Sequence, residues 1–343
     1  MSAVVFERRG RLGIATLNRP AALNALTHEM VVALQSQLDD WRDDDAVQAV
    51  ALTGAGDRGF CAGGDIVAIY HDAREGGTAS VDFWRDEYVL NAAIARYPKP
   101  VVAFMDGIVL GGGIGLAAHA SHRVVTERSS VGLPETTIGF VPDVGGTYLL
   151  SRAPGELGTH LALTAGSVGG ADAIALGLAD VFVPAERLPQ LAATLEAASP
   201  DEAISIVAIT PPPSPLLAQR DWIDAAYAGD DLTTILERLD ALGTPEAATA
   251  AQSIRRKSPT ALLVTLAALR RARRLPDLES VLDQELRVSV HALSWPDLAE
   301  GIRAQVIDKD RTPAWRPASI DAVDPTDVQA AFAPLDVELG LGR

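Results

Sequence analysis

The sequence predicts an α/β fold that continues into a mostly helical C-terminal region. Up to about residue 156, short apolar strand-like runs alternate with segments of helical periodicity, and beyond that point helical periodicity dominates. Strands alternating with helices are typical of an α/β domain. The proline-rich stretch "TPPPSPL" at 210–216 predicts a linker. We therefore expect a core over residues 1–200 and a helical region over residues 201–343 that packs on it.

The composition excludes several classes of protein. The 343 residues carry a formal charge of −16, and so acidic a chain is a poor binder of nucleic acid, whose affinity depends on phosphate contacts. The single cysteine, Cys61, excludes an internal disulfide and suits a reducing compartment. No apolar run approaches the roughly 18 residues of a membrane span, and strand-like sequence from Ala3 leaves no room for a signal peptide. We expect a cytoplasmic protein with no membrane or nucleic-acid partner.

Turn and cap residues predict the first elements. Two β-rich runs around Gly10 predict a hairpin. Thr27 is typical of a helix N-cap, and "VQAVALTGAG" predicts a buried strand that ends in glycines. The helix after Thr27 is expected to run through Trp41, because apolar residues recur at helical spacing at Met30, Val31, Leu34 and Leu38.

The following elements lead to a glycine-rich loop. Residues 79–97 predict a helix that Pro98 and Pro100 terminate. "PVVAFMDGIVLGGGIGLAAHA" predicts a strand, a turn, a glycine-rich loop and a helix, and "HRVVTE" predicts a further strand. Helical periodicity returns from 250 to 310, where the sequence is rich in alanine, leucine and arginine.

Two glycine-rich turns, "CAGGDI" at 61–66 and "VLGGGIGL" at 109–116, follow strands and lead into helices. N–H groups at a helix start have no partner within the helix and favour negative charge. One interpretation is a tight turn, and a second is a dinucleotide site, whose pattern Gly113, Gly115 and Ala118 fit loosely. A third is an oxyanion hole, which needs two N–H groups aimed at one point, and two such turns after adjacent strands could converge to supply them.

Three acids stand in apolar sequence. Glu135 and Asp143 lie in "LPETTIGFVPDVGGTYLL", and Glu87 shares one helical stripe with Phe83, Leu90 and Ile94. Burying a carboxylate is costly, so a buried acid marks pairing or chemistry. The structural alternative for Glu135 and Asp143 is the capping of turns, and for Glu87 it is a salt bridge to an arginine.

Three motifs together resemble the crotonase (enoyl-CoA hydratase/isomerase) superfamily. "GFCAGGDI", "PKPVVAFMDGIVLGGGIGL" and "LPETTIGFVPDVGGTYLL" occur in the order and at the spacing of that superfamily, over roughly residues 3–185. The resemblance implies a crotonase-like spiral of ββα units followed by the helical C-terminal region. It also implies that the backbone N–H groups of Gly64 and Gly112 bind the carbonyl of a CoA thioester, and that "NRPAALNAL" helps to hold the adenine end of CoA.

The acids resemble those of the 3-hydroxyisobutyryl-CoA hydrolases within that superfamily. Hydratases use two glutamates; Glu135 matches one, but Gly115 stands in place of the other, and Asp143 stands where hydratases usually carry glycine. Further segments that resemble this hydrolase family are "FWRDEYVLN" at 83–91, "SPTALLVTL" at 258–266 and "DLAEGIRAQVIDKDRTPAWRP" at 297–317, so that the resemblance spans nearly the whole chain.

The resemblance implies hydrolysis of a short 3-hydroxyacyl-CoA, such as the 3-hydroxyisobutyryl-CoA of valine catabolism, to CoA and the free hydroxy acid. Gly64 and Gly112 would stabilise the oxyanion, Glu135 would act as nucleophile or general base, Asp143 would orient water or substrate, and Glu87 would accept a hydrogen bond from the 3-hydroxyl. The expected partner is the acyl-CoA substrate, without a metal or redox cofactor, and a homo-oligomer is left open. The alternatives are an enoyl-CoA hydratase or isomerase of the same fold and a non-catalytic CoA-binding protein.

Structural roles are favoured for the remaining candidate groups. His119 and His122 lack nearby cysteine or acidic partners in the sequence, which favours helix-end packing over a metal site. Cys61 has no evident histidine partner, which favours packing over a nucleophilic role. "RRARR" at 270–274 predicts a solvated helix face, with contact to CoA phosphates as the alternative.

Overall fold

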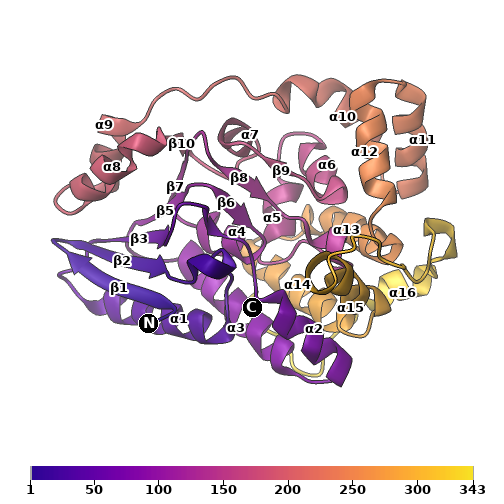
Figure 1. Ribbon diagram of the computed structural model, residues 1–343, viewed down its shortest axis with the longest axis horizontal. Helices are drawn as coiled ribbons and strands as arrows, with labels where there is room; N and C mark the ends of the chain where they lie inside the picture. The colour runs from indigo at the N-terminus through magenta and orange to yellow at the C-terminus, as the bar shows by residue number, and fades with distance from the viewer. Residues whose placement is uncertain (1, 343) are drawn as a thin grey trace. The chain divides into compact units, whose positions relative to one another are not determined.

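The computed structural model describes residues 2–342, which form two compact units interleaved along the sequence (Figure 1). It confirms the α/β fold with a helical C-terminal region. The predicted regions 1–200 and 201–343 do not coincide with the compact units, because two early segments pack with the C-terminal helices. The first unit comprises the chain up to Gly64, Asp86–Gly132 and Ser167–Pro215, and the second comprises Asp65–Arg85, Leu133–Gly166 and the chain from Leu216.

Two sheets organise the first unit. The larger has the order β1-β2-β3-β5-β7-β10, in which β1 and β2 form the predicted hairpin and all other neighbours are parallel. The smaller has the order β4-β6-β8-β9, with β9 antiparallel to its neighbour. The strands are β1 (Val4–Arg9), β2 (Leu12–Leu17), β3 (Ala49–Gly54), β4 (Gly59–Cys61), β5 (Val101–Met105), β6 (Ile108–Leu110), β7 (His122–Val125), β8 (Ser130–Gly132), β9 (Ser167–Val168) and β10 (Val181–Phe182).

Helices pack on the larger sheet through an aliphatic core. Leu191 and Leu195 of α8 and Val207 of α9 belong to one buried cluster with Leu12 and Val124 of the sheet. α3 contains the boundary between the units, at residues 85 and 86. The helices are α1 (His28–Asp43), α3 (Ala79–Ala95), α4 (Gly112–Ala117), α7 (Gly170–Ala175), α8 (Leu188–Leu195) and α9 (Pro200–Val207).

Local sequence signals explain how the first elements form. Gly10 has a φ of 55°, and a Cβ there would collide with the carbonyl oxygen of Glu196, so that only glycine fits the turn of the hairpin. The Thr27 side chain accepts a hydrogen bond from the Met30 N–H, as predicted for an N-cap. The helix α1 that it caps ends at Asp43, slightly beyond the predicted Trp41.

The second unit is helical, and its core includes the stretch between the two predicted acids. Val141 packs with Val264 and Ala268 of α13, Val288 of α14 and Phe332. The helices are α2 (Ile66–Glu75), α5 (Gly146–Ser151), α6 (Leu157–Thr164), α10 (Arg220–Tyr227), α11 (Leu232–Leu242), α12 (Pro245–Arg255), α13 (Pro259–Ala272), α14 (Leu278–Ala292), α15 (Pro296–Ile302) and α16 (Pro325–Ala330), and a 3-10 turn, η2, covers Glu135–Ile138.

Ser258 joins two of the C-terminal sequence motifs. Its hydroxyl accepts from the Ala261 N–H, which caps α13, and donates to Asp297 Oδ2 at 2.6 Å. The other oxygen of Asp297 accepts from the Arg316 N–H at 2.7 Å. Ser258 and Asp297 are both buried, so these bonds fix α13, α15 and the segment around Arg316 to one another.

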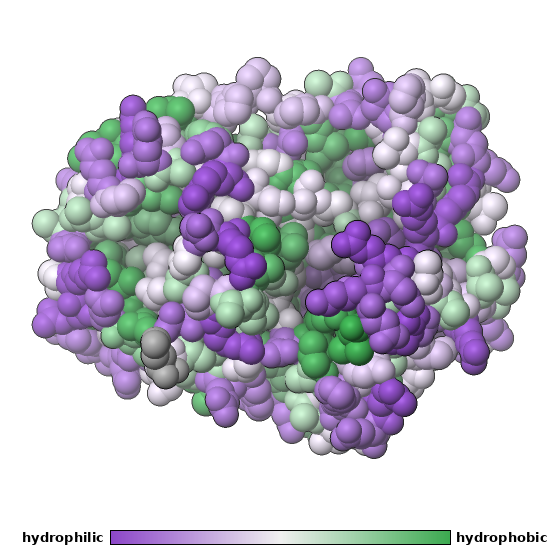
Figure 2. All heavy atoms as spheres, in the orientation of Figure 1, coloured by the Kyte–Doolittle hydropathy of each residue, from purple (hydrophilic) through white to green (hydrophobic). Residues whose placement is uncertain are grey.

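Figure 2 shows hydrophilic and hydrophobic residues mixed over the face that it draws. Within residues 2–342, no helix combines the length and the apolar character that crossing a bilayer requires.

Ser258→Ala is predicted to lower the free energy of unfolding by about 1–3 kcal/mol, because it removes a cap and leaves a buried oxygen of Asp297 without its donor. Thr244→Ala is the matched control, since Thr244 caps α12 at an exposed position and should cost about 1 kcal/mol or less. Urea denaturation of both variants checks this. Equal losses would show that the bond to Asp297 contributes nothing beyond capping.

Candidate active site

Two glycine-rich turns lie side by side in the first unit. β4 and β6 are neighbouring parallel strands, so their carboxyl ends lie at the same edge of the smaller sheet. β4 leads to Gly64 through Gly63, which has a φ of 106°, and β6 leads to α4 through Gly111, which has a φ of 49°. A Cβ built on Gly112 would lie 3.4 Å from the Gly64 nitrogen. The two turns therefore lie close together, and the aim of their N–H groups at one point stays a prediction.

Close packing favours glycine at the start of α4. A Cβ on Gly112 would lie 2.5 Å from Glu87 Oε1, and a Cβ on Gly113 would lie 2.5 Å from the carbonyl oxygen of Cys61. Gly112 is the first residue of α4, and its N–H has no acceptor within the helix. Gly113 and Gly115 lie inside α4 rather than in the turn before it, which removes the basis of the dinucleotide interpretation.

Glu87 is buried beside Gly112. Its side chain is only 2% exposed, and Phe83, Leu90 and Ile94, which share its stripe of α3, are also buried. The predicted inward-facing stripe is confirmed. Because Glu87 Oε1 borders the space next to the Gly112 Cα, this carboxylate faces the same region as the glycine-rich turns.

Cys61 is buried at the end of β4. Burial raises the pKa of its thiol to about 12, and the negative charge of Glu87 acts in the same direction, against a hydrogen bond to Gly63. A thiol with so high a pKa is a poor nucleophile, because only the thiolate attacks. This favours the packing role predicted for Cys61.

Glu135 and Asp143 lie in the second unit and are buried, at 7% and 6% exposure. Glu135 opens η2, and its carbonyl oxygen accepts from the Phe140 N–H at 3.1 Å. Phe140 stacks on Trp84 with ring centroids 5.3 Å apart. The chain around Glu135 is thus held by backbone bonds and aromatic packing. That both acids act together with Gly64 and Gly112 stays a prediction, since these residues belong to different units.

Asp143 begins a backbone turn of unusual conformation. Val144 has a φ of 55° and Gly145 a φ of 78°, and the Gly146 N–H donates to the Asp143 carbonyl oxygen at 2.6 Å. Positive φ is unfavourable for a β-branched residue such as valine, so the surroundings must hold this turn in place.

Glu285 of α14 is a buried acid beside this turn that the sequence analysis does not predict. Its Oε2 accepts from the Gly145 N–H at 2.6 Å, and its Oε1 accepts from the Thr147 N–H at 2.9 Å and from the Thr147 hydroxyl at 2.6 Å. Burial raises the pKa of Glu285 to about 8, and the charge of Asp143 adds to this increase, while the hydrogen bonds from Thr147 and Gly145 oppose it. The sequence signal that could have predicted this buried acid is the position of Glu285 on the apolar face of a helix in the region predicted over 250–310.

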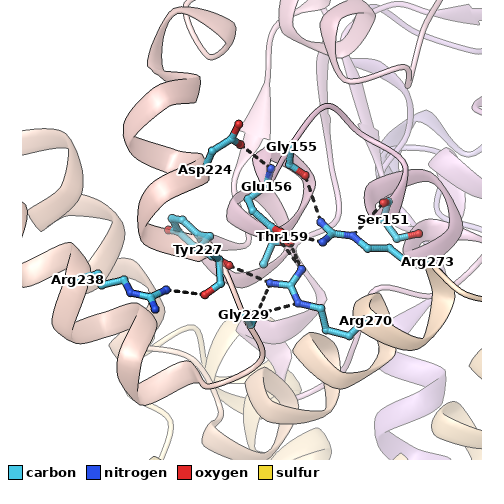
Figure 3. Close-up of polar contacts among 11 residues, drawn as sticks. Ser151, Gly155, Glu156, Thr159, Asp224, Tyr227, Gly229, Arg238, Arg270 and Arg273 are labelled. Atoms are coloured by element: carbon cyan, nitrogen blue, oxygen red, sulfur yellow. Dashed lines mark hydrogen bonds and ion pairs between the residues drawn. The ribbon is translucent and has the colours of Figure 1, made fainter.

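The prediction of a solvated face for "RRARR" is wrong for Arg270. Figure 3 shows Arg270 and Arg273 converging on Glu156, with both ion pairs at 2.8 Å. Arg270 also donates to the carbonyl oxygens of Tyr227 and Gly229, and its side chain is only 14% exposed. Although burial opposes it, the hydrogen bonds to Arg273, Thr159 and Arg270 hold the pKa of Glu156 below its usual value. These arginines tie α13 to α6 and α10, which weakens the alternative of CoA phosphate contacts.

His122 has partners of its own near the end of the glycine-rich segment. Its Nε2 lies 3.2 Å from Asp201 Oδ1, and its Nδ1 lies 2.9 Å from the Ser121 hydroxyl. Over the described part of the chain, no group of three or more histidine, cysteine or acidic side chains has a geometry that could hold a metal ion.

The raised pKa of Glu285 predicts how stability depends on pH. Between the ordinary glutamate pKa of 4.5 and the folded value of about 8, the folded protein keeps a proton that the unfolded chain releases. The contribution of Glu285 to stability is therefore present below that window and is lost as pH rises through it. Relative to Glu285→Gln, the wild type should lose up to about 1.4 kcal/mol per pH unit.

Urea denaturation of the wild type and of Glu285→Gln at several pH values across this window tests the prediction. Glu237→Gln, at an exposed position of α11, is the control and should leave the pH dependence unchanged. Parallel stability curves for the wild type and Glu285→Gln would contradict it.

Comparison with known proteins assigns the family. The family model described as enoyl-CoA hydratase/isomerase matches residues 12–332. Proteins named mitochondrial 3-hydroxyisobutyryl-CoA hydrolase are 39% identical in Danio rerio, over 98% of this chain and 90% of that one, and 37% identical in Homo sapiens, over 97% and 89%.

Two solved structures are also similar over nearly their full length. A carnitinyl-CoA dehydratase from Mycobacterium thermoresistibile has a TM-score of 0.97 and 51% identity, with 99% of each chain covered. An enoyl-CoA hydratase from Rhodobacter sphaeroides has a TM-score of 0.92 and 44% identity, with 97% of this chain and 98% of that chain covered. The chain therefore belongs to the enoyl-CoA hydratase/isomerase family.

Proposed function

We propose that this protein hydrolyses the thioester of a short 3-hydroxyacyl-CoA, with 3-hydroxyisobutyryl-CoA as the first substrate to test. The observation that carries the proposal is the set of residues at positions 115, 135 and 143. Glu135 is present, Asp143 is present where hydratases of this family usually carry glycine, and Gly115 replaces the second hydratase glutamate. Relatives that are 35–39% identical and are named 3-hydroxyisobutyryl-CoA hydrolase support the same choice.

The thioester carbonyl would accept hydrogen bonds from the Gly64 and Gly112 N–H groups. A Cβ on Gly112 would meet Glu87 Oε1 and lie 3.4 Å from the Gly64 nitrogen, so the backbone of the two turns is close at this point. Charge that develops on the carbonyl oxygen is then stabilised by fixed donors, which need no reorganisation. This supplies the electrophilic assistance, and the proposed reaction uses no metal or redox cofactor.

Glu135 would carry the main chemical step by one of two routes. As a nucleophile it attacks the carbonyl carbon, the C–S bond breaks, CoA leaves as thiolate, and water opens the resulting anhydride. As a general base it takes a proton from water, which attacks the carbonyl carbon directly. Both routes yield CoA and the hydroxy acid from one water molecule. Trapping of an acyl intermediate by hydroxylamine would identify the anhydride route.

Asp143 and Glu87 would orient the reactants. Asp143 lies on a turn that holds its backbone in one conformation, which suits a carboxylate that positions water or the 3-hydroxyl group. Glu87 borders the space next to Gly112 and can accept a hydrogen bond from the 3-hydroxyl group of the substrate.

A hydratase or dehydratase is the second candidate, favoured by the names of the two similar structures. Addition of water to an enoyl-CoA in this family uses two glutamates, and position 115 here is a buried glycine inside α4. A thiol-release assay with 3-hydroxyisobutyryl-CoA separates the candidates, because only hydrolysis frees CoA thiol. Loss of enone absorbance from a 2-enoyl-CoA without thiol release would favour the hydratase and contradict our proposal.

Asp143→Asn should lower kcat for CoA release by more than about tenfold, a loss above roughly 1.4 kcal/mol of transition-state stabilisation. The amide keeps the shape of the side chain but removes the charge. Glu135→Gln should cost about 10²-fold or more, because an amide can neither attack nor accept the proton. Thiol release by purified variants, with substrate binding measured separately, checks both. Wild-type turnover in either variant would exclude its proposed role.

Gly112→Ala should reduce thiol release by at least about tenfold, because the new methyl group occupies the space beside the Gly64 nitrogen and displaces the end of the Glu87 side chain. Gly169→Ala is the matched control. Gly169 has a φ of −73°, and a Cβ there would meet no atom within 4 Å, so this variant should keep wild-type activity. An active Gly112→Ala enzyme would show that the substrate carbonyl does not approach this turn.

A further inference from the structure

Glu285 is the buried titratable group that the proposed chemistry leaves without a role. It lies on α14 and is 1% exposed, yet within residues 2–342 its hydrogen bonds come from Gly145 and Thr147 and not from an arginine or lysine. All three donors belong to Gly145 and Thr147, about 140 residues earlier in the chain. A side chain so costly to bury, and bonded entirely to one short turn, indicates a function for that turn.

The turn needs an external support. Val144 and Gly145 both have positive φ, and valine has no local hydrogen bond in its side chain to favour that conformation. The carboxyl group of Glu285 holds the second half of this turn, because one oxygen binds the Gly145 N–H and the other binds the backbone N–H and the hydroxyl of Thr147. Asp143 directly precedes Val144, at the other end of the turn.

The three acceptor contacts explain why the residue is a glutamate. One oxygen accepts two hydrogen bonds and the other accepts one, so both oxygens act as acceptors, which the protonated acid can do as well as the carboxylate. Glutamine retains the acceptor for Thr147 but places an NH₂ donor against the Gly145 N–H. Aspartate retains both acceptors but is one methylene shorter, so it cannot reach both ends of the turn from the same helix position.

We propose that Glu285 is a positioning residue for the hydrolytic reaction, which holds the turn 143–147 in its strained conformation and thereby fixes the direction of the Asp143 carboxylate. The inference rests on the proposed function of Asp143 in thioester hydrolysis. It assigns to α14, in the helical C-terminal region, a direct part in preparing the site. The support acts through the backbone of Gly145 and Thr147, so Glu285 itself need not touch the substrate.

A double-mutant cycle tests this inference. Glu285→Gln should lower kcat for CoA release by about tenfold or more while changing KM by less than about threefold, because a misdirected catalytic group impairs the chemical step more than binding. In an Asp143→Asn background the same substitution should cost less than about twofold, since the group that it positions is already lost. A purely structural role would lower activity by the same factor in both backgrounds, and that result would overturn the proposal.

Variants at Thr147 keep the test open should Glu285→Gln fold poorly. Thr147→Val removes the hydroxyl donor but keeps shape and N–H, and should reduce kcat in the same direction as Glu285→Gln. Thr147→Ser keeps the hydroxyl and should retain wild-type kcat. Equal activity of the valine and serine variants would show that the hydrogen bond from the Thr147 hydroxyl to Glu285 does not matter for the reaction, and would contradict the proposal. A wild-type enzyme that releases no thiol would instead refute the proposed function, whereas an active wild type with a fully active Glu285→Gln variant would refute only the role of Glu285.

Discussion

The close approach of β4, β6 and α4 is the constraint on which the rest of the first unit depends. A Cβ at Gly113 would collide with the backbone of Cys61, and a Cβ at Gly59 would collide with the backbone of Ile108. These strands and the helix can approach only because glycine stands at the contacts. The same approach brings Gly64 and Gly112 together, so the glycines that permit the tight packing also place the two turns next to each other. The packing of this region depends on glycines, which have no side chain to keep the backbones apart.

In the second unit, the segments that carry Glu135 and Asp143 are held by packing against helices. Glu135 and Asp143 stand on short irregular segments, which have little stability of their own and depend on helices from late in the sequence. A Cβ at Gly139 would collide with the carbonyl of Asp297, and one at Gly301 with the backbone of Ile138, so η2 rests directly on α15. Val141 belongs to the core formed by α13, α14 and α16. The C-terminal region is therefore part of the support of the acid-bearing loops, which explains why it carries irregular motifs of its own.

Signals that act over a few residues were sufficient to predict much of the fold. The hairpin at Gly10, the cap at Thr27 and the inward stripe that contains Glu87 follow from backbone sterics and helical periodicity, and all three are present. The strands β8 and β9 are too short for a periodic pattern and were not predicted. The interleaving of the units, the burial of Arg270 and the contact of Glu285 with Gly145 depend on pairs separated by more than a hundred residues, which no local pattern encodes.

Overall similarity does not decide the reaction, because one fold can host several chemistries and the site must be read residue by residue. The structure that is 51% identical to this chain is named for a dehydratase, while a relative that is 39% identical is named for a hydrolase. Both reactions would use the same donors at the thioester carbonyl, since both generate negative charge on its oxygen. They differ in the carbon that reacts: water adds at C3 in hydration and at C1 in hydrolysis. The resemblance to hydratases implies that hydration uses a second acid at position 115, where this chain has a glycine enclosed in α4. The additional acid of this chain, Asp143, lies on a turn in which Val144 has an unfavourable positive φ. If the direction of the Asp143 carboxylate controls the reaction, the unfavourable φ of Val144 and the buried acid Glu285 beside it both have a functional explanation.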